Sequence, residues 1–144
     1  MDGGGSGQYA SWGVFQPGSS TTDSKSDVEK LFGPPDGDAL QLGAGGSVDV
    51  TFNDFLIYDS AGPDIRIHAT IGPEEKASVY GSEDGVDFEF ITIIPNPPQS
   101  HDDPSFEVDI TAGALSYILF LRVIDSKSGN GIEIDSIEVI NPPQ

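Results

Sequence analysis

Gly131–Ile140, with the sequence GIEIDSIEVI, is the stretch that decides the fold. Alternate residues of a regular strand face opposite sides, so a half-buried strand keeps its apolar residues in one phase. Here the phase changes along the run, from Ile132 and Ile134 to Ile137 and Val139. A straight strand would expose one of these pairs. The run therefore predicts a strand with a β-bulge near Asp135 and Ser136, and burial of Ile137 and Val139 together with Ile134.

Strand patterns of the same kind recur along the chain, separated by turn residues, and no long window keeps a helical period. The stretch 117–124 is almost entirely apolar, which predicts a central strand. Only Ser26–Phe32 has a helical pattern, ended by Gly33-Pro34-Pro35. The sequence therefore predicts an all-β protein, a jelly-roll sandwich of about eight antiparallel strands. The expected strands cover residues 9–15, 48–52, 65–71, 76–82, 88–94, 106–110, 117–124 and 132–140.

The length of 144 residues fits one domain, which we place at residues 9–140. Residues 1–8 read as a flexible leader or linker and residues 141–144 as a C-terminal linker, so we expect a module of a longer chain. The start lacks the features of a signal peptide, and no run of 18 apolar residues predicts membrane insertion.

The chain is strongly acidic, with 24 Asp and Glu against 6 Lys and Arg and a formal net charge of −18. Its field repels nucleic acids and anionic membranes, which leaves cations or neutral molecules as partners. There is no cysteine, which excludes disulfides, thiolate metal sites and a cysteine nucleophile.

A series of turn motifs carries a resemblance to a known family. In order, these are Pro17-Gly18, residues 33–37 (GPPDG), 42–47 (LGAGGS), 59–65 (DSAGPDI), 75–80 (EKASVY), 82–85 (SEDG) and 134–139 (IDSIEV). Their order and spacing resemble bacterial cell-surface domains with a galactose-binding-like jelly roll. The resemblance implies an extracellular or cell-surface, non-catalytic module whose relatives include carbohydrate-binding modules with a structural calcium ion.

Acids beside turns are the candidates for binding that ion. Calcium takes six to eight oxygen ligands from carboxylates and backbone carbonyls. Asp59 and Asp64 flank a Gly-Pro turn, and Asp125 and Asp135 lie at loop edges of two strands, so we expect these four to share calcium. The alternative is that they cap turns. A second, weaker set consists of Asp36, Asp38, Asp84 and Asp87.

Catalytic motifs are missing from the sequence. It has neither a Gly-x-Ser-x-Gly elbow nor a His-Glu-x-x-His motif, and its two histidines read as a strand residue, His68, and a loop residue, His101. We therefore expect no enzymatic activity.

Aromatic side chains indicate a ligand surface. Sugars have an apolar face that stacks on aromatic rings and a polar rim that hydrogen-bonds with polar side chains. Trp12, Tyr58, Tyr80 and Tyr117 are the aromatic candidates, and Trp12 could also simply pack against the sandwich. We predict a ligand site of Trp12, Tyr80, Arg66 and His68, with the last three forming a shallow platform.

The sequence thus favours a calcium-binding extracellular module for binding or adhesion, with a neutral or weakly charged glycan as the leading ligand class. The alternative function is a structural spacer in a bacterial surface protein, with no ligand except the ion. Exposed aromatic residues would favour sugar binding, whereas buried ones would favour the spacer.

Overall fold

The computed structural model describes residues 9–16, 18, 28–33, 39–52, 56–59, 63–70, 76–94, 105–110, 115–126 and 132–140. It contains β1 (Trp12–Gln16), the 3-10 helix η2 (Val28–Leu31), β2 (Leu40–Gln41), β3 (Ser47–Thr51), β4 (Ile57–Tyr58), β5 (Ile65–Thr70), β6 (Ala77–Ser82), β7 (Glu89–Ile94), β8 (Ser105–Val108), β9 (Tyr117–Ile118), β10 (Phe120–Asp125) and β11 (Glu133–Val139).

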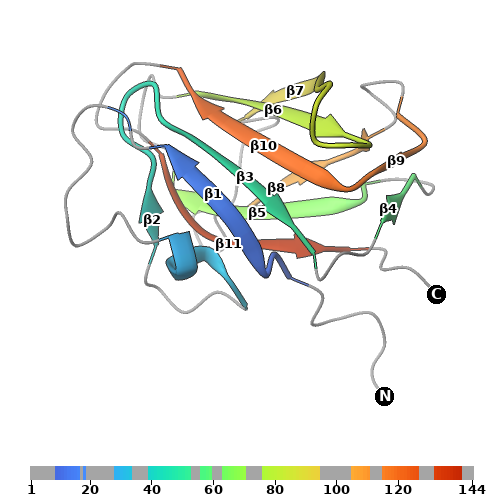
Figure 1. Cartoon of the computed structure of the whole chain (residues 1–144). Helices are drawn as coiled ribbons and strands as arrows, with labels where there is room; N and C mark the ends of the chain where they lie inside the picture. Colours follow the sequence, from blue (N-terminus) through green and yellow to red (C-terminus); the bar gives the residue numbers. More distant parts are fainter. Residues whose placement is uncertain are drawn as a thin grey trace.

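The strands form two facing layers (Figure 1). One layer is a five-stranded sheet in the order β1-β3-β10-β6-β7, and the other is a four-stranded sheet in the order β2-β11-β5-β8. A short two-stranded ribbon of β4 and β9 lies at one end. All strand pairs are antiparallel. The protein is therefore the predicted jelly-roll β-sandwich.

Eight of the strands in the described ranges are longer than two residues, which agrees with the sequence prediction of about eight. The apolar run 117–124 supplies β10, which lies in the middle of its sheet between β3 and β6, as expected. Within the expected helix the structure has η2. The expected linkers, 1–8 and 141–144, lie outside the described residues.

The core lies between the two sheets and is built by period-2 alternation. In β5, Ile65, Ile67 and Ala69 are buried while the residues between them face outward. In β10, Leu121 and Val123 are buried in the same way. Each sheet therefore has one inner face that is buried in the core and one outer face that is exposed to solvent.

The bulge predicted in the last strand is present. The register of β11 against β5 shifts between Ile134 and Ser136, so that Ile134 pairs with Ala69 and Ser136 with His68. Ile134, Ile137 and Val139 are all buried, as predicted. The hydroxyl of Ser136, itself buried, donates a hydrogen bond of 2.7 Å to the carbonyl of Gly33 and ties the bulge to the end of the helical turn.

No helix among the described residues is long and apolar enough to cross a membrane.

Deletion of Asp135 and Ser136 together should abolish cooperative folding. Ile137 would then follow Ile134 directly, so pairing with β5 would turn Ile137 and Val139 outward, and each such side chain contributes about 1.5–3 kcal/mol when buried, a large part of a stability of about 5–15 kcal/mol. Deletion of Asp135 alone is the matched control, because it removes only the extra residue, leaves regular alternation up to Val139 and keeps both side chains buried. Thermal melting followed by circular dichroism measures both. A cooperative melt of the double-deletion variant near the parent temperature would contradict this account of the phase change.

Candidate functional site

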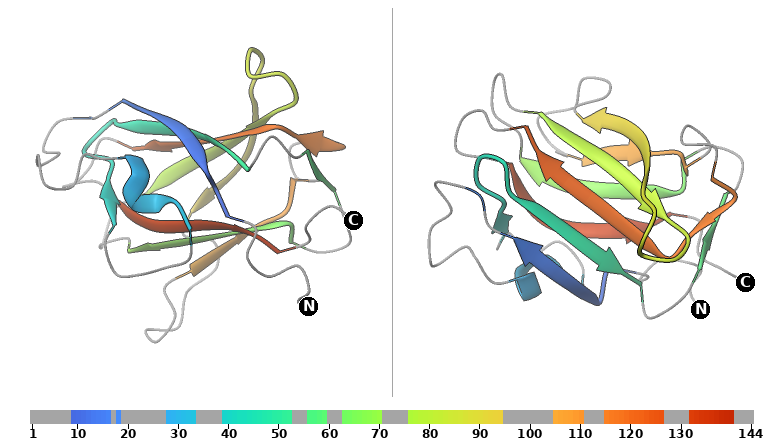
Figure 2. Two further views of the ribbon diagram at one scale, coloured as in Figure 1. Left: turned by 60° about the horizontal axis from the view of Figure 1, so that its bottom comes forward. Right: turned by 45° about the horizontal axis from the view of Figure 1, so that its top comes forward.

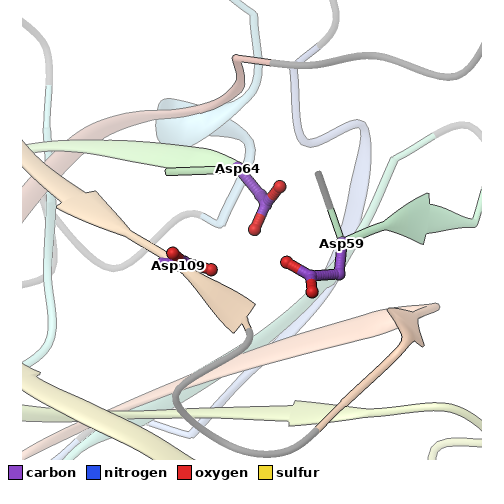
Figure 3. A group of neighbouring side chains, drawn as sticks. All are labelled: Asp59, Asp64 and Asp109. Atoms are coloured by element: carbon purple, nitrogen blue, oxygen red, sulfur yellow. The ribbon is translucent and has the colours of Figure 1, made fainter. Parts of the chain in front are cut away.

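Three aspartates meet at the end of the sandwich where β4 lies (Figures 1 and 3). Asp59 follows β4, Asp64 precedes β5 and Asp109 follows β8. One carboxylate oxygen from each lies within 4.8 Å of the other two. Asp64 is fully buried, Asp109 is half-buried and Asp59 is exposed, so the cluster runs from the interior to the surface. This geometry offers a cation hard oxygen ligands and a path to solvent.

The backbone around Asp64 is fixed by hydrogen bonds. Its N–H donates to the carbonyl of Val108, its carbonyl accepts from the N–H of Ile140, and its Oδ2 accepts from the N–H of Ile110 at 3.1 Å. The N–H of Asp59 donates to the carbonyl of Ser116. The carboxylates are thus held close together, and a bound cation would offset their mutual repulsion.

The structure brings Asp59 and Asp64 together but places Asp125 and Asp135 elsewhere. β10 begins beside the β4–β9 ribbon and runs to the opposite end of the sandwich, where Asp125 is its last residue (Figure 1). Asp135 lies in the bulge, opposite the second half of β5, whereas Asp64 precedes that strand. One ion cannot reach all four, and this part of the sequence prediction is corrected.

Asp125 has a structural position instead. It is almost fully buried, and its two carboxylate oxygens accept hydrogen bonds from the N–H groups of Ile132 at 2.9 Å and Gly45 at 3.3 Å. It therefore joins the turn before β3 to the start of β11. This is the turn-capping alternative that the sequence left open for these acids.

Asp109 was missed by the sequence prediction. Its only signal is an acid at the edge of a short apolar run, which it shares with Asp59 after β4 and Asp64 before β5. What brings it to Asp64 is the pairing of Ile65 with Val108 between β5 and β8, which the local pattern does not reveal.

The outer face of the five-stranded sheet carries most of the exposed large apolar side chains. Trp12, Val14, Phe90 and Ile93 are each between 46% and 51% exposed and all lie on its strands. Soluble proteins seldom leave such side chains clustered on one face without a function, so this surface is the candidate ligand site. We call it the aromatic face.

Two aromatic pairs flank the middle of the aromatic face. Trp12 of β1 meets Phe120 of β10 edge to face, with ring centroids 6.5 Å apart. Tyr80 of β6 meets Phe90 of β7 in the same manner at 5.7 Å. Trp12 and Tyr80, both predicted ligand residues, therefore share one face of the sheet.

A bidentate ion pair lies between the two aromatic pairs. Arg122 of β10 donates from Nε to Asp49 Oδ1 at 2.7 Å and from Nη2 to Asp49 Oδ2 at 2.9 Å. The guanidinium carbon lies 3.7 Å from the ring centroid of Phe88. The pKa of Arg122 is raised, chiefly by this hydrogen bond with Asp49. A hollow of about 220 Å³ opens beside the pair, lined by Val14, Gln16, Ser47, Asp49, Arg122 and Ile124.

The β6–β7 loop, residues 83–88, stands out from this layer (Figure 2). Asp84 Oδ1 accepts hydrogen bonds from the N–H groups of Val86 and Asp87 and from the Ser82 hydroxyl. Gly85 has a positive φ of 83°, and a Cβ there would lie 2.7 Å from the Phe120 ring. The loop therefore rests on Phe120. It limits the aromatic face at the end where β10 begins.

Arg66 and His68 lie on the other side of the molecule. Both face outward from β5 in the four-stranded sheet, where Arg66 pairs with Glu107 at 2.9 Å and His68 Nε2 lies 2.9 Å from Glu138. Tyr80 faces outward from the opposite sheet. The predicted platform of Tyr80, Arg66 and His68 is therefore not formed. The alternation of polar and apolar residues indicates that each of these side chains faces outward. It does not indicate which of the two outer faces carries each of them.

Charge is distributed unequally between the two outer faces. On the four-stranded sheet, Glu107, Glu133 and Glu138 all occupy outward positions. Among the outward positions of β1, β3, β10 and β6, Asp49 is the only acid, and Arg122 neutralises it. In a chain of net charge −18 the outer face of these four strands is therefore nearly neutral, whereas Glu89 is exposed on β7 and Glu83, Asp84 and Asp87 lie on the adjoining β6–β7 loop.

Neither a scan against protein-family models nor a search of curated proteins found a match to this sequence. Solved structures do match its fold. A family 32 carbohydrate-binding module produced by Clostridium perfringens is 16% identical, with a TM-score of 0.58 and coverage of 90% of this chain and 93% of the module.

Two further modules are similar over nearly their whole length. One is the first family 32 module of a family 31 glycoside hydrolase from C. perfringens, with a TM-score of 0.61, 11% identity and coverage of 92% and 96%. The other is chitosan-binding module 1 of a chitosanase/glucanase from Paenibacillus sp. IK-5, with a TM-score of 0.59, 10% identity and coverage of 90% and 94%. The chain has the galactose-binding-like jelly-roll fold of carbohydrate-binding modules.

Asp125→Ala should destabilise the protein by about 2–4 kcal/mol, because the buried N–H groups of Ile132 and Gly45 lose their acceptor. The loss should be equal in calcium and in chelator, since Asp125 lies far from the acidic cluster. Asp125→Asn keeps one oxygen acceptor and should lose less. Denaturant unfolding measures these differences. A loss confined to calcium-containing buffer would return Asp125 to the ion site.

The β6–β7 loop should loosen in acid. Hydrogen bonds from the N–H groups of Val86 and Asp87 are the main causes that lower the pKa of Asp84 below its ordinary value of 3.8. Because the pKa of Asp84 is lowered in the folded state, its carboxylate orders the loop fully at pH values above its ordinary pKa. This order is lost as the pH falls through the lowered pKa. NMR shifts of the Val86 and Asp87 amides should follow this titration, with β3 amides reporting general unfolding. Asp84→Asn should remove the titration, and unchanged loop shifts in the parent would contradict the assignment.

Proposed function

We propose that this chain is a non-catalytic carbohydrate-binding module of an extracellular bacterial protein, and that the sugar binds on the aromatic face. The observation that carries the proposal is the combination on one sheet of exposed aromatic rings with a fixed polar pair, Arg122 and Asp49. The resemblance of the fold to carbohydrate-binding modules supports it.

The chemistry of the face suits a sugar ring. A pyranose has an apolar face of C–H groups that stacks on aromatic side chains, and hydroxyls around its edge that need hydrogen-bond partners. Trp12 and Phe90 present exposed rings, while Arg122, Asp49 and Gln16 present donors and acceptors between them. A surface for a purely apolar partner would not place an ion pair at its centre.

We propose in addition that Asp59, Asp64 and Asp109 hold a calcium ion. All three ligand groups are carboxylates. Hard cations such as calcium bind carboxylate oxygens by preference, and softer transition metals prefer them less. With Asp64 fully buried, a bound cation would stabilise the folded state by offsetting the charge of the cluster. The site lies where β4, β5 and β8 meet, so the ion would join strands that are distant in sequence.

A structural spacer that carries only calcium is the alternative function. It would need no exposed rings, and Trp12 at 51% and Phe90 at 49% exposure favour the binding module.

Calcium should raise the melting temperature, and Asp109→Asn or Asp59→Asn should remove this shift. Binding to the folded state alone adds about 2.7 kcal/mol when calcium is at a hundred times its Kd. Melts in calcium and in excess chelator, on protein first shown by elemental analysis to be calcium-loaded, give the measurement. Asp87→Asn removes an acid outside the cluster and should keep the full shift. Equal shifts in all four proteins would exclude the cluster as the site.

Trp12→Ala and Phe90→Ala should each weaken glycan binding by about tenfold, because stacking on one ring is worth about 1–2 kcal/mol. Affinity electrophoresis in gels containing soluble polysaccharides, with calcium present, is the measurement. Tyr58→Ala is the matched control, since Tyr58 is 53% exposed but lies on the β4–β9 ribbon. Unchanged binding in both face variants, or loss in the control alone, would place the sugar elsewhere, and retardation by no polysaccharide would favour the spacer.

A further inference from the structure

We infer that the ligand of the aromatic face is an internal stretch of a neutral polysaccharide, lying across the strands with the Arg122–Asp49 pair beneath its middle. The inference rests on the proposed function for its site and adds the charge class, the length and the direction of the ligand.

The strand register places one outward residue from each strand in a single row. Val14 pairs with Asp49, Asp49 with Arg122, Arg122 with Tyr80, and Tyr80 with Phe90. Neighbouring strands lie about 4.8 Å apart, so this row across five strands spans about 19 Å. That length accommodates several linked pyranose rings.

Within the part of the chain that the structure describes, the row is exposed at both of its ends. β1 and β7 are the edge strands of the sheet, and their residues in the row, Val14 and Phe90, are 47% and 49% exposed. Along the strands, by contrast, the β6–β7 loop rests on Phe120 and bounds the face. A chain can therefore run across the strands and continue past both edges. This favours internal segments over chain ends.

The charge of the row selects against anionic sugars. Arg122 and Asp49 neutralise each other through two hydrogen bonds, so a uronate finds no unpaired cation there. Polyanions also meet the field of a protein with net charge −18. A neutral glycan needs no counter-ion at this pair, and the field of the protein does not repel it.

The same pair can hydrogen-bond a neutral sugar. Arg122 directs Nε and Nη2 to Asp49, and Nη1 makes no hydrogen bond within the described residues, so its donors are available. The carboxylate of Asp49 retains acceptor capacity beside them. Phe88 stacks on the guanidinium and fixes its plane. A donor and an acceptor held side by side match two adjacent hydroxyls of one sugar ring.

The test is isothermal titration in calcium with soluble β-glucan, xylan, galactomannan and galactan, then with an oligosaccharide ladder of the best binder from one to six rings. Affinity should rise with each ring until the row is filled and then level off, with the monosaccharide too weak to compete. Reduction of the terminal sugar should leave the affinity of the long oligosaccharides unchanged. Alginate, as the anionic polymer, should bind at least tenfold more weakly.

Arg122→Gln should weaken binding by about tenfold, since it removes hydrogen bonds from a charged donor. Arg66→Gln, on the opposite face, is the matched control, and melting curves verify that both variants are folded. Binding that is equal for one ring and six, that prefers alginate, or that survives Arg122→Gln would overturn this inference while leaving the proposed function in place. Binding of no glycan at all would overturn both.

Discussion

The structure depends on one constraint, the need of β11 to bury apolar residues on both sides of a phase change. The bulge between Ile134 and Ser136 meets it with one extra residue. Beyond the bulge the strand pairs with β5 as far as Val139 and Ile65, and the N–H of Ile140 then reaches the carbonyl of Asp64. A local correction of register thus also sets the position of Asp64, the buried member of the acidic cluster.

Much of the fold could be predicted because alternation is a local signal. The runs around Val48, Ile65 and Ile137 show in sequence which residues face the core, and the phase change showed the bulge. Which acids converge is a different question, because it depends on pairing between distant strands. Asp109 reaches Asp64 only through the pairing of β5 with β8, so the sequence indicated two members of the cluster and missed the third.

The proposed ligand face holds two of the four residues that the sequence suggested for it. Trp12 and Tyr80 face outward from the five-stranded sheet, but Arg66 and His68 face outward from the other sheet. The order β1-β3-β10-β6-β7 decides which residues share a face, and it joins strands from both ends of the chain. Arg122 and Asp49, 73 residues apart, meet for this reason alone. No local pattern marks either residue as part of a site.

The uneven distribution of charge has a consequence for the protein in concentrated solution. Exposed rings on one face invite copies of the molecule to associate through them, and the net charge of −18 opposes this by repulsion between copies. Such repulsion reaches only about 8 Å at physiological ionic strength and about 3 Å in molar salt. The acids spread over the remainder of the surface therefore act as a solubilising coat for the neutral face, and this coat becomes thinner as the salt concentration rises.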